Sequence, residues 1–327
     1  MKIRLDQNEM PFPPPKEIIE AVKLNIENIN RYTPQIEVNK LVQLISDYSK
    51  VSANSISLSS GSDILIKEFI FLFSRKRQII IADPSFFLIN NAAQKTSSPL
   101  IKIRLREPEF NLSIESFIHE INKPTLLVFD NPNNPTGSLL LTQTDVKTML
   151  ENENVILLID EAYFEFSKIT YAPWIEDYPN LAVSRTLSKS FGLAGSGIGY
   201  LIAGELVQEK FQGLDIMLPS PSVIAAIHAL RNLDYMKKYI EEIDQEKERI
   251  SKIVSNMEIS VYDSYTNFLL MKTGIYDIAQ KLAEQGIYVS NVSNNYSLSP
   301  EFIRVTIGSI EDNDFFINSM KKIVESK

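Results

Sequence analysis

One lysine, Lys189, lies in the segment Ser184–Gly195, which is rich in hydroxyl groups and glycines. The segment follows the apolar run Leu181–Val183, so the lysine is expected where a strand passes into a loop. A lysine amine there can form a Schiff base with an aldehyde cofactor, while the hydroxyls of Thr186 and Ser188 and backbone N–H groups hold a phosphate. By itself, such a segment is more often a glycine-rich turn with a solvated lysine.

Two further polar blocks stand directly after apolar runs. Residues 131–137 read Asn-Pro-Asn-Asn-Pro-Thr-Gly, and residues 160–163 read Asp-Glu-Ala-Tyr. Asp160 can place a carboxylate beside a protonated ring nitrogen, and Tyr163, three residues on, returns to the same face. Local alternatives exist, because Asp160 could cap a helix and residues 131–137 could be only a tight turn.

Short apolar runs alternate with helical patterns as far as residue 203. These runs are residues 56–58, 78–81, 125–129, 155–159, 181–183 and 199–203. The alternation predicts an α/β fold with a mainly parallel sheet that helices cover on both faces. Polar residues follow several of these runs, namely Asp83, Asp130 with Asn131, Asp160, and Arg185 with Thr186. Ligands of such sheets bind beyond the carboxyl ends of the strands, so we expect one site at this edge.

The pattern changes near Pro219. Residues 219–327 combine helical patterns (222–233, 235–253, 276–285, 312–326) with strand-like segments (260–262, 267–271, 287–289, 302–307), which predicts a smaller α+β domain. Residues 1–15 carry four prolines and predict an extended arm, followed by a helix over 16–30. We expect residues 1–30 to pack with the small domain and residues 31–218 to form the large, cofactor-binding domain.

Composition excludes several classes of protein. The chain has 327 residues, is 44% hydrophobic and carries a net charge of −8, which argues against a nucleic-acid partner. It has no cysteine, which excludes thiol catalysis and fits a cytoplasmic location. The two histidines lie far apart, so no metal site is expected. No signal peptide opens the chain, and no apolar run approaches the length that spans a membrane.

The three blocks, in this order and at these distances, resemble the fold-type-I pyridoxal 5′-phosphate (PLP) aminotransferases of class I and II. The resemblance extends over the whole chain. Residues 8–12, Asn-Glu-Met-Pro-Phe, resemble the Asn-Glu-Asn-Pro segment of histidinol-phosphate aminotransferases. The resemblance therefore implies an aminotransferase of the histidinol-phosphate aminotransferase-like subgroup, a homodimer that exchanges an amino group between an L-amino acid and a 2-oxo acid.

The resemblance also implies a role for each matching residue. Lys189 is the Schiff-base lysine and proton shuttle, Asp160 pairs with the pyridine nitrogen, and Tyr163 and Asn134 bond the cofactor's phenolic oxygen. The phosphate meets the amides of Gly61, Ser62 and Asp63, which open a helix, and the hydroxyls of Thr186, Ser188 and Tyr32, the last from the other subunit. Phe86 stacks on the ring, unless it is a core residue. Arg304, Asn8 and Phe12 bind substrate, although Arg304 could instead form a structural salt bridge.

Two positions depart from the family. Gly197 stands where an arginine usually binds the cofactor phosphate, and Arg185 is one candidate to replace it. Ser290 stands where histidinol-phosphate enzymes carry an arginine for the substrate phosphate. These departures favour a substrate with a free α-carboxylate over histidinol phosphate. Two alternatives stay open, a PLP decarboxylase of the threonine-phosphate type and a non-catalytic protein of the same fold.

Overall fold

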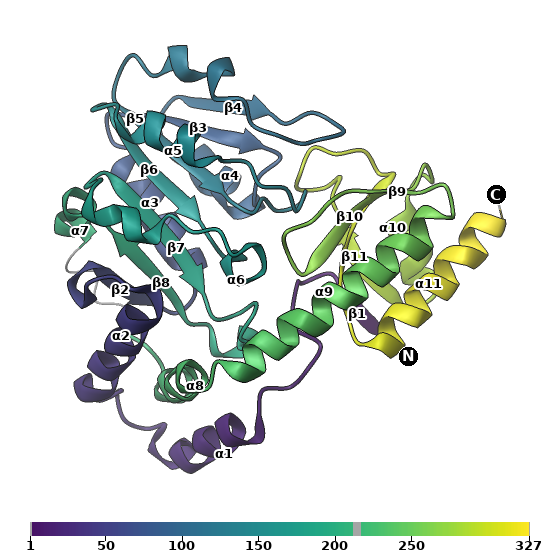
Figure 1. Ribbon diagram of the computed structural model, residues 1–327, viewed down its shortest axis with the longest axis horizontal. Coiled ribbons are helices and arrows are strands. Elements are labelled where there is room, and N and C mark those ends of the chain that lie inside the picture. The colour runs from purple at the N-terminus through teal and green to yellow at the C-terminus, as the bar shows by residue number, and fades with distance from the viewer. Residues whose placement is uncertain (1, 212–216, 327) are drawn as a thin grey trace.

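Two β-sheets organise the chain, of which this computed structural model describes residues 2–211 and 217–326 (Figure 1). The larger sheet has seven strands in the order β2-β8-β7-β6-β5-β3-β4. Its strands are β2 (Ile56–Ser59), β3 (Gln78–Asp83), β4 (Leu100–Arg104), β5 (Thr125–Asp130), β6 (Val155–Asp160), β7 (Leu181–Thr186) and β8 (Gly199–Ala203). β3 to β7 are parallel to one another, and β8 is antiparallel to both of its neighbours. The mainly parallel sheet predicted from the sequence is confirmed.

Helices cover both faces of this sheet. Successive residues of a strand point to opposite sides, and in the central strands the side chains on both sides are apolar and need to be buried. On β5, Leu126 and Val128 belong to one apolar cluster and Leu127 and Phe129 to another. The first cluster includes α3 (Ser62–Phe73), α4 (Phe87–Gln94) and α7 (Glu205–Phe211). The second includes α2 (Gln35–Ser49), α5 (Gln143–Leu150) and α8 (Ser220–Arg231). With both faces buried, polar side chains appear mainly where the strands end.

The smaller sheet has the order β1-β11-β12-β10-β9. Its strands are β1 (Ile3–Leu5), β9 (Ser260–Val261), β10 (Phe268–Lys272), β11 (Ile287–Asn291) and β12 (Phe302–Thr306). β1 pairs parallel with β11, and the other pairs are antiparallel. The helices α9 (Asp234–Ser255), α10 (Ile278–Glu284) and α11 (Ile310–Glu325) pack beside it (Figure 1).

The first thirty residues divide between the two halves of the molecule. β1 joins the small sheet, whereas α1 (Lys16–Asn25) packs against α8, which also contacts α2 (Figure 1). The short α6 (Phe164–Ser167) follows β6. The domain boundary expected at residue 219 stays a prediction.

The described residues show neither a membrane-spanning helix nor a metal-binding cluster. Over residues 2–211 and 217–326, none of the helices has both the length and the apolar character needed to cross a membrane. The same residues contain no group of three or more His, Cys, Asp or Glu side chains that could hold a metal ion.

Candidate active site

A cavity of about 580 Å³ lies beyond the carboxyl ends of β3, β5, β6 and β7. The N-terminal arm (Asp6–Glu9) and the small domain close its other sides. It brings together twelve of the predicted residues: Asn8, Gly61, Ser62, Asp63, Phe86, Asn134, Asp160, Tyr163, Thr186, Ser188, Lys189 and Arg304. Gly197 and Ser290 line it as well. The roles predicted for these residues stay proposals, but the structure places them in one site.

Asp160 ends β6 and is buried. Its Oδ1 accepts a hydrogen bond of 2.8 Å from the Ser184 hydroxyl on the neighbouring strand. Burial raises the pKa of Asp160 to about 7, with a further contribution from Asp130. It caps no helix, since α6 begins after Tyr163. No salt bridge to Asp160 occurs among the described residues. The ionised form of a buried acid without a salt bridge would be stabilised by a cation, such as the protonated ring nitrogen of PLP.

Lys189 follows β7 in the loop that the sequence predicted. Its Nζ donates a hydrogen bond of 3.3 Å to the backbone carbonyl of Gln7 in the arm. Burial, and then the positive charge of Arg304, lower the pKa of Lys189 to about 8. A lysine with a lowered pKa carries more of the neutral, nucleophilic amine near pH 7 than an exposed lysine does.

The first turn of α3 forms a cradle for an anion. Gly61 stands at the N-cap, where no side chain bonds the helix, so its first N–H groups and its positive dipole end face the cavity. β8 approaches this turn closely, since a Cβ on Gly199 would lie 2.1 Å from the Ser62 nitrogen. Thr186 and Ser188 add hydroxyls that lie 3.0 Å apart. This donor set fits the phosphate of PLP.

Gly197 also lines the cradle, and its φ of 58° lies in the left-handed region that favours glycine. An arginine in the same backbone conformation would be strained. The glycine and its conformation therefore agree with each other, and the cradle relies on amides and hydroxyls at this point.

Arg185 does not replace the missing arginine, so that expectation is wrong. Its guanidinium donates to Glu161 Oε2 at 3.0 and 2.9 Å and lies 3.8 Å from the centre of the Phe164 ring. The reason is strand geometry: Ser184 and Thr186 point to the cavity side of β7, and the residue between them must point to the other.

The cofactor ring would lie between Phe86 and the residues that follow β6. Phe86 lines the cavity and also packs against the apolar cluster that includes α3 and α4. Its stacking on the cofactor ring stays a prediction. Tyr163 is buried, and its hydroxyl accepts a hydrogen bond of 2.7 Å from the Asn8 side chain. The backbone N–H of Asn8 in turn donates a hydrogen bond of 2.9 Å to the Thr306 hydroxyl.

Arg304 of β12 is only 5% exposed. Its Nη1 donates to Asn134 Oδ1 at 2.5 Å and to the Tyr296 hydroxyl at 3.2 Å, and its Nη2 donates to the Asp6 carbonyl at 2.6 Å. Its Nε is buried without a partner, and within the described chain it joins no salt bridge. The structural salt bridge considered above is therefore not found there. A buried guanidinium without a carboxylate partner is suited to an anionic ligand.

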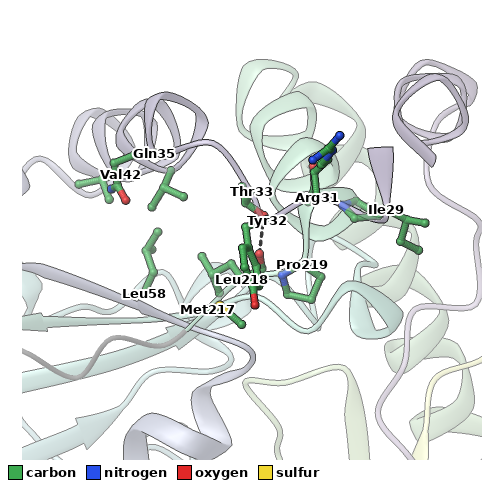
Figure 2. A pocket seen from close by; sticks show the side chains of 13 residues that line it. Ile29, Arg31, Tyr32, Thr33, Gln35, Val42, Leu58, Met217, Leu218 and Pro219 are labelled. Carbon is green, nitrogen blue, oxygen red and sulfur yellow. Dashed lines mark hydrogen bonds between the residues drawn. The ribbon is translucent and has the colours of Figure 1, made fainter. Parts of the chain in front are cut away.

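Two predicted residues lie outside this cavity. Phe12 packs against Tyr239, with ring centres 5.2 Å apart. Tyr32 is 80% exposed and lines a second cavity of about 550 Å³ between α2, β2 and residues 217–221 (Figure 2). Within the described chain, Tyr32 therefore does not contribute to the first cavity.

The structure adds residues to which the sequence gave no role. Asp130, at the end of β5, is a buried acceptor at the cavity wall. The sequence pattern that pointed to Asp160, an acid directly after an apolar run, is also present at Asp130 and could have identified it. Tyr296 lines the cavity from the loop after β11, where the sequence has no periodic pattern. The carbonyls of Asp6 and Gln7 belong to the backbone, so no side-chain motif could reveal them.

Comparison with known proteins decides the family. The model of the family "Aminotransferase class I and II" matches residues 1–320. The chain belongs to this family. The aminotransferase is 34% identical to the histidinol-phosphate aminotransferase of Sulfurisphaera tokodaii, over 99% of this chain and 91% of that protein. It is 35% identical to the histidinol-phosphate aminotransferase of a Thermoanaerobacter species, over 99% and 93% of the two chains.

The fold of the aminotransferase also matches solved structures. The histidinol-phosphate aminotransferase of Sinorhizobium meliloti, solved in complex with PLP, superposes with a TM-score of 0.87 at 23% identity, over 99% of this chain and 91% of that one. The predictions of a fold-type-I aminotransferase of this subgroup, of an enzyme, and of PLP as its cofactor are confirmed. The decarboxylase and non-catalytic alternatives are not favoured.

Proposed function

We propose that this aminotransferase acts on L-amino acids with a free α-carboxylate, with a 2-oxo acid as acceptor. The balance of charge in the cavity supports the proposal. Among the described residues that line it, the basic side chains are Lys189 and Arg304, and the acidic ones are Asp6, Glu9, Asp63, Asp130 and Asp160. Such a lining suits one carboxylate beside the cofactor better than it suits a second phosphate.

Arg304 carries the proposal. A guanidinium can bond a planar carboxylate with two parallel N–H groups, and here Nε has no other partner. Asn134 and Tyr296 hold Nη1, so they fix the plane of the group before substrate arrives. The substrate carboxylate would displace the Asp6 carbonyl from Nη2 and orient the α-carbon toward Lys189.

The remaining residues serve the proton transfer. Bound PLP supplies an electrophilic aldehyde and a ring that withdraws electrons from the substrate α-carbon. Lys189 Nζ takes the proton from that carbon and returns it, and its lowered pKa suits both directions. Asp160 keeps the proton on the ring nitrogen, while Tyr163 and Asn134 bond the ring oxygen.

The test is a comparison of kcat/KM for aromatic, acidic and aliphatic amino acids and for histidinol phosphate, with 2-oxoglutarate as acceptor and carbon dioxide release followed in parallel. We expect an amino acid to be the best donor, with a keto acid formed and no carbon dioxide released. A clear lead for histidinol phosphate would refute the proposed substrate class, and stoichiometric carbon dioxide would indicate a decarboxylase.

We also propose that the enzyme is a cytoplasmic homodimer. Exposed apolar side chains line the second cavity, among them Ile29 (67% exposed), Tyr32 and Met217 (67% exposed). Ile36, which is 74% exposed, follows the lining residue Gln35 in the first turn of α2. Large apolar patches are uncommon on the free surface of monomers. Figure 2 shows Tyr32 and Met217 at this cavity, and a second copy that covers the patch would bring Tyr32 toward the neighbouring site. The absence of cysteine supports the cytoplasm.

Sedimentation of the wild type and of Ile36→Glu tests the dimer. We expect the charged variant to dissociate and to lose activity in proportion, with Lys40→Glu on the same helix as the control. A wild-type monomer with full activity at the assay concentration would contradict the proposal.

A further inference from the structure

Asp130 is the most heavily hydrogen-bonded acid in the wall of the active-site cavity. It is 2% exposed, and its two oxygens accept four hydrogen bonds. Oδ1 accepts from the Ser85 hydroxyl at 2.9 Å and from the Asn133 side chain at 3.1 Å. Oδ2 accepts from the backbone N–H of Phe86 at 3.0 Å and of Asn134 at 2.7 Å.

These donors come from two separate loops. Ser85 and Phe86 belong to the loop between β3 and α4, and Asn133 and Asn134 to the loop after β5. The first loop presents the Phe86 ring to the cavity. The second presents the Asn134 amide, which holds Arg304 at 2.5 Å. The carboxylate of Asp130 therefore connects the loop that carries Phe86 with the loop that carries Asn134, and Asn134 in turn contacts Arg304.

We propose that Asp130 is a positioning residue of the active site, whose carboxylate fixes Phe86 and Asn134 relative to each other and so sets the ring surface against the amide. The inference rests on the roles proposed above for those two residues. It assigns Asp130 no contact with substrate and no part in proton transfer.

The chemistry of the group explains why an acid is needed. The two oxygens of a carboxylate can accept from all four donors. A side-chain amide of the same size has only one oxygen that accepts. The acid is also costly at this place, because Asp130 and Asp160 stand directly opposite each other on β5 and β6, both buried. A second acid next to a buried acid opposes folding, so stability alone would favour a neutral residue here.

Asp130→Asn tests the proposal with little change in volume. If the new amide oxygen faces the two backbone N–H groups, its NH₂ group faces the donor of Asn133, whose own oxygen accepts from Thr136 at 2.6 Å. The hydrogen bond from Asn133 is then lost, whereas the Ser85 hydroxyl can rotate to accept from the new NH₂ group. We expect the dissociation constant of PLP from the apoenzyme to rise roughly tenfold or more. The visible ellipticity of the bound cofactor should change, because the ring surface shifts.

Glu161→Gln is the matched control. Glu161 is also a buried acid with four hydrogen bonds, but it faces Thr170, Tyr171 and Arg185 on the other side of the sheet. We expect this variant to lower the thermal midpoint without altering the ellipticity of bound PLP. If Asp130→Asn does not fold, Ser85→Ala removes one donor and should produce a smaller change in the same two signals.

Two further variants separate this inference from the proposed site. Phe86→Ala and Asn134→Ala should each alter PLP affinity and ellipticity. If they do and both Asp130→Asn and Ser85→Ala leave the dissociation constant within about twofold and the ellipticity unchanged, the inference about Asp130 is overturned while the site stands. If Phe86→Ala and Asn134→Ala are silent, the roles proposed for those residues fail, and the inference fails with them.

Discussion

Ser290→Arg should convert the preference of this aminotransferase toward a phosphate-bearing substrate. Ser290 lines the cavity, and its backbone lies directly opposite Arg304 on the antiparallel partner strand. Side chains at such paired positions share a face of the sheet, so an arginine at 290 would reach the same region of the cavity as Arg304. Two adjacent guanidinium groups can bind the dianion of a phosphate ester, which a single group binds less well.

The size of the effect follows from the contact that is added. A hydrogen bond to a charged group contributes about 1.5–3 kcal/mol, which corresponds to roughly ten- to a hundredfold in affinity. Repulsion between the two guanidinium groups, before substrate binds, takes part of this away. We therefore expect kcat/KM for histidinol phosphate to rise about tenfold, at the lower end of that range. The value for the best amino acid should not rise.

The assay compares kcat/KM for both substrates in wild type, Ser290→Arg and Ser290→Gln, at low and high salt. Ser290→Gln adds a polar side chain without charge, so it controls for filling the cavity. The gain should be confined to the arginine variant and should shrink as salt screens the contact. Equal gains in the two variants, or no gain in either, would refute the reasoning about position 290.

Three other outcomes test the chemistry of the site. Lys189→Ala should lose the covalent link to PLP that borohydride fixes in the wild type; peptide mapping by mass spectrometry checks it, and an adduct on another lysine would exclude the assignment. In the wild-type apoenzyme, the rate of covalent PLP capture should rise with pH through about 8, because the neutral amine of Lys189 is the nucleophile; stopped-flow absorbance measures it, and a flat profile from pH 6 to 9 would contradict it. Asp160→Asn should lower kcat by at least about a hundredfold, yet stabilise the apoenzyme at pH 8. The pKa of Asp160 is raised by folding, so the acid opposes folding increasingly from about pH 4 up to about pH 7, by at most a few kcal/mol; thermal melts should show a clearly larger gain in the melting temperature of Asp160→Asn at pH 8 than at pH 5, and equal gains at the two pH values would count against a buried, uncompensated Asp160.

The sequence predicted the large sheet and its site edge because both depend on local patterns. Apolar runs of three to five residues that are followed by acids or hydroxyls identify buried parallel strands and their carboxyl ends. The convergence of Asp160 and Thr186 needs no further information, whereas Phe86 was expected at the site only from the family resemblance. The same patterns could not identify β4, because apolar residues in Leu100–Arg104 alternate with the charged Lys102 and Arg104. This strand is at the edge of the sheet and is only partly buried.

Long-range contacts explain what the sequence did not reveal. β1 is only three residues long, and its pairing with β11 joins segments more than 280 residues apart. Tyr296 enters the cavity only because its loop turns back toward Arg304, for which the sequence has no period or motif. The error at Arg185 differs in kind, because the alternation of side chains along β7 was sufficient to separate it from Thr186.

The pairing of β1 with β11 has a consequence for work with this protein. A shortened chain that begins at Met10 would keep every side chain of the three motif blocks and would still match the family. It would nevertheless leave the edge of β11 without its partner, an open edge of the kind that templates aggregation. It would also remove the carbonyl that holds Arg304 and the amide that holds Tyr163. If such a truncated protein were insoluble or inactive, the result would therefore not bear on the chemistry of the full chain. Expression tags are better placed at the C-terminus, beyond α11.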